Sequence, residues 1–465
     1  MTDQLSQIHD RGVELIKQGD LNGAKLHFQA VLLSNPVYYP ALANLAVILS
    51  DQNHLLAAKV LYQKIIKVVD QDPNQWSNFG NILFRLGEFK ESEKALKRAT
   101  ELAPDNINGW YNFALLYHYS GRQKEAQAAL DQVEALGHST SRIKEDRAHF
   151  YLAEGDLPFA LEHYEERWNS LMHQEPWDFH LPEWKGEDLT DKTILIHHEQ
   201  GFGDTIMTAR FVSDFAQKYD CGVVFAVPSA LVELFESQDW PGVEVVAIET
   251  LDKPKVDFHS PLWSMVRWRG INKADIRGEK YLKAPKIVTP SAINPQMVNV
   301  GICWASGKRN SPMDVRRRIS PLKDWLCLSE HPMVQLHNLW KDGDAQVEID
   351  SLGASCLILN QVDNLHSFAE TAAYLTKFDL VVGVDTAIIH LSAALGIQTY
   401  MVSHLAHCWR WWDIKAGLGT PWYNALAIVH QKDQSDWKTP LLEVQDRVFP
   451  WIDAMVESRQ GRIAA

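Results

Sequence analysis

The sequence predicts an α + α/β protein, in which a helical repeat array precedes two lobes that each contain a parallel β-sheet. Small and turn-forming residues recur every 34 residues through the first third of the chain, and such a period is typical of stacked helical repeats. From Thr193 the pattern changes to short apolar runs, glycine turns and amphipathic stretches, and it restarts at Val298. This alternation is typical of parallel sheets covered by helices. We expect the following division: repeats over 1–170, a linker over 171–192, a first lobe over 193–295 and a second lobe over 296–465.

Four positions of the repeat keep their residue type through five consecutive units. Small residues occupy Gly12, Ala46, Gly80, Ala114 and Ala148, and again Ala24, Ala58, Ser92, Ala126 and Ala160. The turns fall at Gly19, Asn53, Gly87, Gly121 and Gly155, and large apolar residues follow at Phe28, Tyr62, Leu96, Leu130 and Tyr164. Gly and Asn tolerate the left-handed conformation that ends a helix. The segment therefore resembles tetratricopeptide (TPR) repeats, which stack into a superhelix whose concave face usually binds a peptide or another protein.

Composition excludes several classes of function. The 465 residues carry 45 Lys and Arg against 59 Asp and Glu, a net charge of -14, so no field over the whole molecule attracts nucleic acid. The five cysteines lack CxxC spacing, which argues against a structural zinc site and a disulfide scaffold. No signal-peptide core is seen and no apolar stretch reaches the roughly 18 to 20 residues of a membrane span, so we expect a cytoplasmic protein that does not cross the membrane.

The α/β part is expected to alternate strands and helices twice. In the first lobe the apolar runs predict strands over 193–198, 222–228 and 243–248, and helices over 205–219 and 229–237. The pattern pauses over 255–295. In the second lobe we expect strands over 298–305, 356–363, 379–384 and 398–403, helices over 367–378 and 386–396, and a closing helix over 446–460. Two Rossmann-like lobes that face each other across a cleft are typical of the GT-B architecture of nucleotide-sugar glycosyltransferases.

A glycine turn, Gly201-Phe202-Gly203-Asp204, follows the first strand of the first lobe. Ligands of open α/β sheets bind at the carboxyl ends of the strands, and Gly203 would let a ligand approach the backbone. Asp204 could accept a proton from an acceptor hydroxyl as it attacks a sugar carbon. It could equally cap the helix that begins there. The dinucleotide fingerprint G-x-G-x-x-G is absent, because Ile206 occupies the third glycine position.

The segment Asp385-Thr386-Ala387 lies between a strand and a helix of the second lobe. Helix N-termini present amide hydrogens and a partial positive charge, so they accept a diphosphate without a metal. Thr386 would donate to a phosphate oxygen, whereas Asp385 would repel phosphate and more plausibly caps the helix or accepts from a sugar hydroxyl. His390 falls on the same helix face, although a lone His in a helix is more often a packed residue.

A basic loop follows the first strand of the second lobe, with Ser306 and Lys308 near its start and Arg316-Arg317-Arg318 further on. These cations could neutralise a leaving nucleoside diphosphate, which divalent metals do in other glycosyltransferases; a solvated loop is the alternative. No DxD-like motif stands at a strand end, so we expect no metal and no other cofactor. The run Trp409-Arg410-Trp411-Trp412 could stack a sugar or base, or bury the interface between the lobes.

Taken in order, these motifs resemble the heptosyltransferase-like (family 9) GT-B glycosyltransferases. The resemblance is strongest to bacterial proteins that fuse TPR repeats to such a domain, some of which glycosylate flagellin. It implies that Asp204 is the general base and that the Ser306 loop with Lys308 binds donor phosphates. The other implied donor-site residues are Gly203, Asp385, Thr386, Ala387, His390, Trp409 and Arg410. Where relatives have P-F-A-P-D-W-R-W, this chain has H-L-A-H-C-W-R-W over 404–411, which leaves the identity of the donor open.

The resemblance also implies a mechanism and an acceptor. Asp204 would deprotonate the acceptor, which attacks the anomeric carbon with inversion while the second lobe stabilises the departing diphosphate. The acceptor would be a protein held by the TPR repeats, for which Asn78, Asn81 and Asn112 in the inner helices are suggestive. Two alternatives stay open: transfer to a lipid-linked or surface glycan, and a non-catalytic TPR scaffold whose GT-B domain is degenerate. Self-association into a homo-oligomer is also open.

Overall fold

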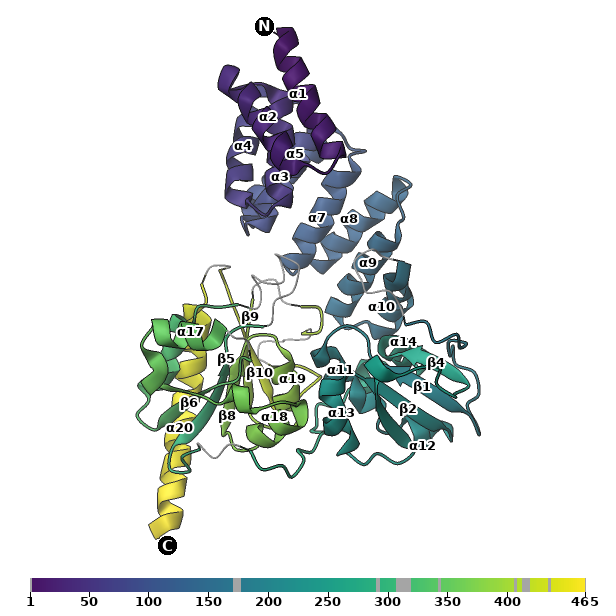
Figure 1. Ribbon diagram of the computed structural model, residues 1–465, viewed down its shortest axis with the longest axis vertical. Helices are drawn as coiled ribbons and strands as arrows, with labels where there is room; N and C mark the ends of the chain where they lie inside the picture. The colour runs from purple at the N-terminus through teal and green to yellow at the C-terminus, as the bar shows by residue number, and fades with distance from the viewer. Residues whose placement is uncertain are drawn as a thin grey trace. The chain divides into compact units, whose positions relative to one another are not determined.

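The computed structural model describes residues 2–169, 177–289, 293–306, 319–341, 344–404, 408–411, 419–433 and 436–464. The chain divides into two compact units, Met1–Ile143 and Lys144–Ala465, and Figure 1 shows the order of their helices and strands. None of the described helices has the length and the apolar character needed to cross a lipid bilayer.

Helices that follow one another pack as pairs in the first unit, α1 with α2, α3 with α4, α5 with α6 and α7 with α8. Their bounds are α1 (Thr2–Lys17), α2 (Leu21–Ser34), α3 (Tyr39–Asp51), α4 (Leu55–Val68), α5 (Pro73–Arg85), α6 (Phe89–Leu102), α7 (Ile107–Tyr119) and α8 (Gln123–Ala135). The first helices of successive pairs also touch, as α5 and α7 do. This is the solenoid that the 34-residue period predicts.

The turn and crossing positions of the repeat have the roles that the sequence assigns to them. The five turn residues have φ angles of 81°, 60°, 81°, 74° and 79° at Gly19, Asn53, Gly87, Gly121 and Gly155, which is the left-handed region. A Cβ on Gly80 would lie 2.6 Å from the Leu96 side chain, and Ser92 donates to the Gly80 carbonyl at 2.7 Å. The helices of a pair cross this closely only because both positions are small.

The fifth helix pair, α9 (Ser141–Glu154) and α10 (Leu157–Tyr164), lies at the boundary of the two units. The repeat pattern continues to Tyr164, but the first compact unit ends at Ile143, earlier than the predicted end of the repeats at residue 170. Helix α10 contacts α14 of the first lobe, and Leu161 and Tyr164 share a hydrophobic core with Trp263. The apolar face of the last pair is therefore buried against the α/β part.

The first lobe has a four-stranded parallel sheet in the order β3-β2-β1-β4. Its strands are β1 (Thr193–His197), β2 (Gly222–Val227), β3 (Val243–Ala247) and β4 (Phe258–Pro261), and its helices are α11 (Phe202–Thr208), α12 (Phe215–Tyr219), α13 (Ser229–Glu236) and α14 (Leu262–Trp268). The predicted strands over 193–198, 222–228 and 243–248 are confirmed. Strand β4 falls in the predicted pause, because F-H-S-P has no apolar run that would reveal it.

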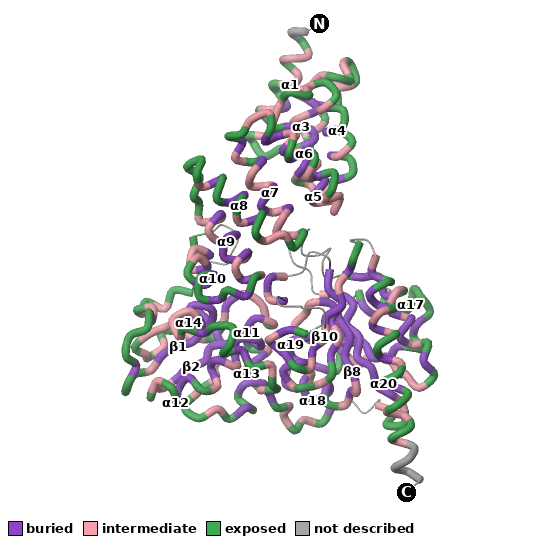
Figure 2. Tube along the Cα trace, turned by 180° about the vertical axis from the view of Figure 1, so that it is seen from behind, coloured by how far each residue is buried: buried purple, intermediate pink, exposed green. Residues whose placement is uncertain are grey.

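The second lobe has a six-stranded parallel sheet in the order β10-β9-β8-β5-β6-β7. Its strands are β5 (Val298–Cys303), β6 (Val334–Asn338), β7 (Ile358–Asn360), β8 (Leu380–Gly383), β9 (Thr399–Ser403) and β10 (Leu426–His430). Its helices are α16 (Leu322–Trp325), α17 (Asp344–Ser351), α18 (Phe368–Leu375), α19 (Ala387–Ala394) and α20 (Lys438–Ala464). Every residue of β5 and β8 is buried, and Figure 2 shows the same for the middle of this sheet. Strands buried on both faces read as continuous apolar runs, which is why β5, β8 and β9 were predictable.

Two helix predictions need correction. The helix expected over 205–219 is broken into α11, a 3₁₀ turn at Ala209–Phe211 and α12. Thr208 donates to the Asp204 carbonyl at 2.7 Å and Ser213 donates to the Arg210 carbonyl at 2.9 Å, and such bonds compete with the regular helix pattern. The closing helix is longer than 446–460, because α20 begins at Lys438 and includes Pro450.

Candidate functional site

A cavity of about 810 Å³ lies in the α/β unit, where residues from both lobes line it. The first lobe contributes the turn between β1 and α11, including Gly203 and Asp204. The second lobe contributes Ala305 and Ser306 after β5 and the segment Asp385–Ala387 after β8. Both groups stand at the carboxyl ends of parallel strands, which is where open α/β sheets bind ligands.

Asp204 is buried at the start of α11, where 6% of it is exposed. One carboxylate oxygen, Oδ2, accepts a hydrogen bond from the backbone N–H of Gly201 at 3.2 Å. The other, Oδ1, accepts from Nε of Arg410 at 2.6 Å, and a second guanidinium nitrogen contacts the same oxygen. Gly201 is the N-cap residue of α11, and Asp204 lies three residues further on, where its carboxylate caps the backbone N–H of Gly201. The same side chain lines the cleft.

Arg410 reaches the cleft from the segment after β9 and binds groups of the first lobe. Besides Asp204 it donates to Oε1 of Gln200 at 2.7 Å and to Sγ of Cys408 at 2.9 Å. Burial by itself lowers the pKa of Arg410, but the nearby charges, that of Asp204 first, raise it above its ordinary value overall. The guanidinium is a permanent cation among the residues that line the candidate site.

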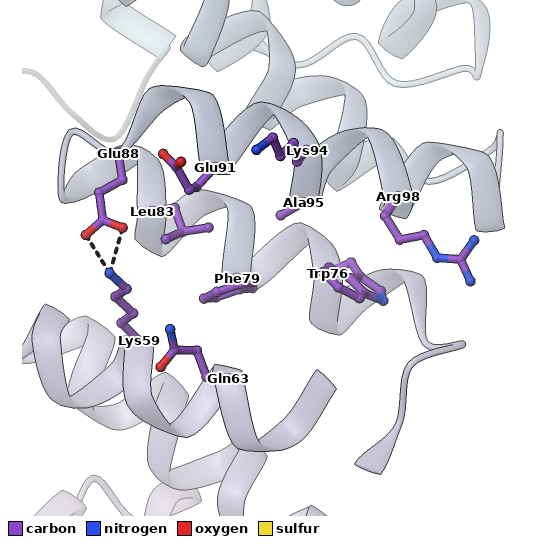
Figure 3. A pocket seen from close by; sticks show the side chains of 10 residues that line it. All are labelled: Lys59, Gln63, Trp76, Phe79, Leu83, Glu88, Glu91, Lys94, Ala95 and Arg98. Carbon is purple, nitrogen blue, oxygen red and sulfur yellow. Dashed lines mark hydrogen bonds and ion pairs between the residues drawn. The ribbon is translucent and has the colours of Figure 1, made fainter. Parts of the chain in front are cut away.

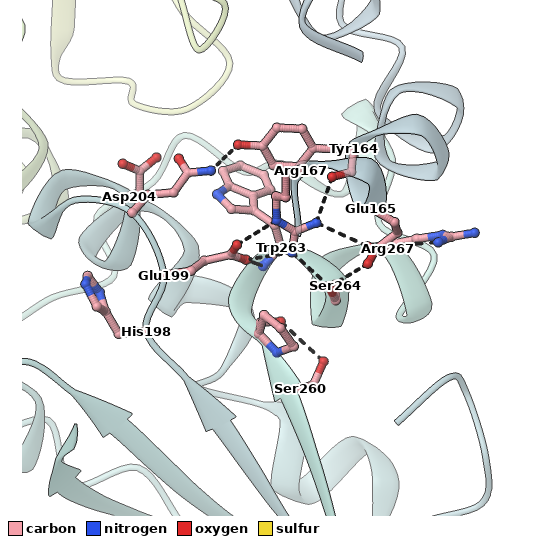
Figure 4. A network of polar contacts seen from close by, with 12 residues as sticks. Tyr164, Glu165, Arg167, His198, Glu199, Asp204, Ser260, Trp263, Ser264 and Arg267 are labelled. Atoms are coloured by element: carbon pink, nitrogen blue, oxygen red, sulfur yellow. Dashed lines mark hydrogen bonds and ion pairs between the residues drawn. The ribbon is translucent and has the colours of Figure 1, made fainter. Parts of the chain in front are cut away.

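A chain of polar contacts links Asp204 and Arg410 to the last helix of the repeats, and Figure 4 shows the part of it around Tyr164, Arg167 and Glu199. Gln200, which accepts from Arg410, donates from its amide nitrogen to the hydroxyl of Tyr164 on α10. Arg167, three residues after Tyr164, pairs with Glu199, the residue before Gln200. Its Nε lies 2.8 Å from Oε2 of Glu199, and a second guanidinium nitrogen lies 3.2 Å from Oε1. These contacts fix the backbone that leads into the glycine turn.

The carboxylate of Glu199 is buried, and both of its oxygens accept hydrogen bonds. Its Oε1 also accepts from the backbone N–H of Trp263 at 2.5 Å. Arg167 in turn donates to the hydroxyl of Ser264 at 2.9 Å, and that hydroxyl donates to Glu165 at 3.0 Å. Burial raises the pKa of Glu199 and the Arg167 charge opposes that shift. A buried ion pair of this kind is costly to disrupt, because the remaining charge would have no partner.

Thr386 and His390 occupy the start and the inner turn of α19. Thr386 is the N-cap residue and its side chain makes no capping hydrogen bond; its hydroxyl lies 3.7 Å from Sγ of Cys303. His390 is 3% exposed, with Nδ1 at 2.9 Å from the hydroxyl of Tyr423 and its ring stacked on Trp411 at 4.9 Å between centroids. His390 is thus a packed helix residue that also lines the cavity.

Gly203 has a different constraint from the one that the sequence suggests. A Cβ at this position would lie 2.7 Å from Cδ2 of His390, closer than real Cβ atoms come to a neighbour. Helix α11 and helix α19 are in contact here. The missing side chain lets the imidazole of one lobe rest on the backbone of the other, and so brings the two cleft walls together.

The remaining predicted residues fall in three groups. Ser306, Asp385 and Ala387 line the cavity together with Arg410. Trp409 does not: 7% of it is exposed, and its ring packs edge-on against Trp263 and Tyr164 at 5.3 and 6.3 Å. Lys308, the arginines at 309 and 316–318, and Trp412 lie outside the described residues.

His198, which no sequence motif singles out, lines the cavity together with Asp204. Its Nδ1 lies 2.5 Å from the hydroxyl of Thr205, and burial lowers its pKa against the opposing effect of the Asp204 charge. Its position shortly before the glycine turn, at the end of the first strand, could have indicated that it lies near the site. Trp340 and Lys341 also line the cavity and were not predicted. They follow β6, a strand that no apolar run in the sequence predicts.

No group of three or more His, Cys, Asp and Glu side chains is placed to hold a metal ion in the ranges that the structure describes. The polar side chains that line the cleft include the carboxylates of Asp204 and Asp385, the imidazoles of His198 and His390, and the guanidinium of Arg410.

Comparison with known proteins identifies the repeats. The TPR repeat family model matches residues 80–132. Protein FlbA of Caulobacter vibrioides is 28% identical over 326 residues, which is 63% of this chain and 52% of the relative. The chain thus spans about half the length of the curated relative that it matches.

Several solved TPR structures are similar to part of the chain. MamA has 20% identity and a TM-score of 0.31, and the match covers 34% of this chain and 92% of MamA. The thermophilic TPR protein TTC0263 of Thermus thermophilus has 22% identity and a TM-score of 0.32, with 36% and 91% covered. The family match and the helix pairs of 34-residue period agree: the chain has an N-terminal TPR solenoid followed by an α/β region with two parallel sheets.

Proposed function

We propose that the protein is a glycosyltransferase that moves a sugar from a nucleotide-sugar donor to an acceptor, with inversion and without a metal. The observation that carries the proposal is the cavity of about 810 Å³, which Asp204 lines from one lobe and the start of α19 lines from the other. A carboxylate suits proton removal from an acceptor hydroxyl. A helix N-terminus suits a diphosphate leaving group.

The second lobe would bind the donor. The amides at the start of α19 and the Thr386 hydroxyl would bind the diphosphate, and the Ser306 loop with Lys308 would add further donors and a positive charge. Asp385 carries the wrong charge for phosphate, so in this proposal it accepts from a sugar hydroxyl. Arg410, which also lines the cavity, would add a second positive charge.

The ion pair between Asp204 and Arg410 has a specific consequence for this mechanism. Two guanidinium nitrogens of Arg410 contact Oδ1 of Asp204, so this oxygen is already occupied when no donor is bound. A bound diphosphate offers Arg410 another anion with which it can form charge-assisted hydrogen bonds. We therefore propose that donor binding draws Arg410 toward the diphosphate and leaves Asp204 available as the base.

A protein is the proposed acceptor, because TPR repeats are an architecture that binds proteins. Asn81 on α5 donates to Asn112 on α7 at 3.0 Å, and Asn112 lies 3.1 Å from the hydroxyl of Ser77. These amides form a polar row on the inner helices, the type of side chain that binds peptide backbones. Transfer to a lipid-linked or surface glycan remains the alternative acceptor.

A non-catalytic scaffold is the second candidate function. It is favoured by the fact that both oxygens of Asp204 already have protein partners, Gly201 and Arg410. In that case the TPR solenoid would be the functional part.

Incubation of the protein with nucleotide sugars and a cell extract of candidate acceptors separates the two functions. The enzyme proposal expects release of a nucleoside diphosphate and a sugar-sized mass increase on an acceptor protein. A mass increase on a glycan fraction instead would move the acceptor to the alternative. Absence of nucleoside diphosphate release with every donor, together with retained binding of a protein partner, would favour the scaffold.

A further inference from the structure

A second cavity, of about 470 Å³, lies within the TPR solenoid (Figure 3). Helices α4 and α6, the second helices of neighbouring pairs, form its walls, and α5 lies beneath them. Since the first helices of the pairs touch one another, as α5 and α7 do, the polar row described above belongs to the other face of the solenoid. We call this cavity the α4–α6 groove.

The floor of the α4–α6 groove is apolar and held in place. Phe79, Leu83 and Ala95 are buried beneath it, and Trp76 is half-buried. The indole N–H of Trp76 donates to the carbonyl of Asp70 at 2.8 Å, so its polar atom is satisfied and its ring can present an apolar surface. Such fixed aromatic side chains are typical anchors of protein interfaces.

The charges of the groove differ between its two ends (Figure 3). At one end Lys59 and Glu88 neutralise each other, with Nζ–Oε2 at 2.6 Å. Further along α6 the groove is lined by Glu91, Lys94 and Arg98, each about one turn from the next, and Arg98 lies at the end where Trp76 is. In the described part of the chain no hydrogen bond or ion pair is recorded for either cation, whereas neighbouring Lys97 pairs with Glu101 at 3.9 Å.

We propose that the α4–α6 groove binds an acidic peptide segment of a partner protein that carries one large apolar side chain. The apolar side chain would pack on Trp76 and Phe79, and carboxylates of the same segment would pair with Lys94 and Arg98. Charge complementarity carries this choice, because beyond the Lys59–Glu88 pair the groove is lined by two cations, Lys94 and Arg98, and one carboxylate, Glu91. The proposal goes beyond the glycosyltransferase function and does not depend on it.

Binding of defined peptides to the full-length protein tests the proposal. The probes are fluorescein-labelled short peptides in which one Leu or Phe is flanked by Glu residues, and matched peptides with Lys for Glu or Ser for the apolar residue. Fluorescence polarisation is expected to show binding of the acidic apolar series alone, with affinity that falls as salt rises. Equal binding of the Lys series, or no binding of the acidic series, would overturn the proposal.

Charge reversal on α6 tests the location. The double substitution Lys94→Glu and Arg98→Glu is expected to weaken peptide binding about tenfold or more, as the loss of two charge-assisted contacts does. The matched control is Lys90→Glu with Lys97→Glu, which makes the same charge change on the same helix outside the groove. Equal losses in the two double variants would contradict the assignment.

Two further measurements keep the result interpretable. Trp76→Ala is expected to weaken binding while circular dichroism shows unchanged helix content, since Trp76 is only half-buried. A labelled oligothymidine serves as a competitor, because cations beside an aromatic ring also suit single-stranded nucleic acid. Binding of the oligonucleotide with the same dependence on Lys94 and Arg98, in place of the peptides, would replace the proposed partner.

Discussion

The carboxylate of Asp204 and the guanidinium of Arg410 form an ion pair across the cleft, although 206 positions separate them in the chain. Their side chains are 9% and 11% exposed. The pair joins the glycine turn of the first lobe to the tryptophan-rich segment of the second. It is also the contact that the proposed reaction has to rearrange.

Asp204→Asn is expected to abolish glycosyl transfer while donor binding stays nearly unchanged. Asn keeps the size of the side chain and can accept at the helix cap, but it is not a base. Removing a general base costs about 10² to 10⁴ in rate. The rate of nucleoside diphosphate release should therefore fall while the affinity for the donor stays the same. The matched control is Asp252→Asn, at an exposed position. Equal loss of donor binding would make Asp204 a structural residue or a donor ligand.

Arg410→Ala is expected to destabilise the α/β unit by about 3 kcal/mol, because it leaves a buried carboxylate without its cation. Urea unfolding of the single and double variants with Asp204→Asn measures the coupling. The double variant should be more stable than the sum of the single effects predicts. Additive effects would mean that the ion pair contributes nothing net.

Arg410→Lys addresses the proposed movement of the cation. Lys keeps the charge but loses the planar group that binds two acceptors at once. We expect thermal stabilisation by a nucleoside diphosphate to fall, with a smaller change in the unliganded protein. Unchanged stabilisation by the nucleotide would show that Arg410 does not turn to the donor.

Tyr164→Phe tests the link between the last repeat helix and the cleft. The substitution removes the hydroxyl that accepts from Gln200 and costs about 1 kcal/mol of stability, the usual value for one buried hydrogen bond. Because Gln200 also holds Arg410, we expect kcat to fall with little change in the KM for donor. A loss of stability without any kinetic change would limit Tyr164 to packing.

Gly203→Ala is expected to cost about 1 to 3 kcal/mol, the usual range for overpacking. The new methyl group would lie 2.7 Å from the His390 ring and force the lobes apart or the ring out of place. Gly419→Ala is the matched control, since a Cβ there meets no atom within 4 Å. Thermal unfolding of the two variants should differ by several degrees. Equal midpoints would show that the His390 ring moves without cost.

The stability of the protein should fall between pH 6.5 and about 4 in a way that depends on His337. Burial lowers the pKa of His337 from 6.5 to about 4, so the folded state keeps the imidazole neutral where the unfolded state binds a proton. The free energy of unfolding is therefore at its full value above pH 6.5. It falls by about 3 kcal/mol as the pH drops to about 4, because the unfolded state takes up the proton first. The variant His337→Gln should show a flatter profile over this range in urea unfolding.

The sequence revealed features that follow from local spacing. The 34-residue period predicted the solenoid because each turn and crossing residue acts within its own helix pair, as Gly80 and Leu96 do. Asp204 and Thr386 were predictable because both follow buried apolar strands, whose carboxyl ends define the cleft. Strands β4 and β6 were missed, since F-H-S-P and V-Q-L-H-N mix polar residues into short runs. Strand β10 was also missed, although L-A-I-V-H is an apolar run.

Contacts between distant segments were beyond sequence reasoning. No residue pattern near Asp204 predicts that Arg410 is its partner. None near Gly203 predicts that this glycine lies against His390. The hydrogen bonds that link Tyr164 through Gln200 to Arg410 could not be predicted either, because the 34-residue period places Tyr164 only within its own repeat. These relationships arise from packing between elements, and no local pattern encodes them.

Thermal unfolding with a panel of nucleoside diphosphates and nucleotide sugars, each without metal and then with it, tests whether the protein has a nucleotide-sugar site. A ligand that binds only the folded state raises its stability by mass action. We predict that one nucleotide class raises the Tm without metal, and that the Asp204→Asn variant shows the same shift. No shift with any member of the panel would contradict the assignment of a nucleotide-sugar site.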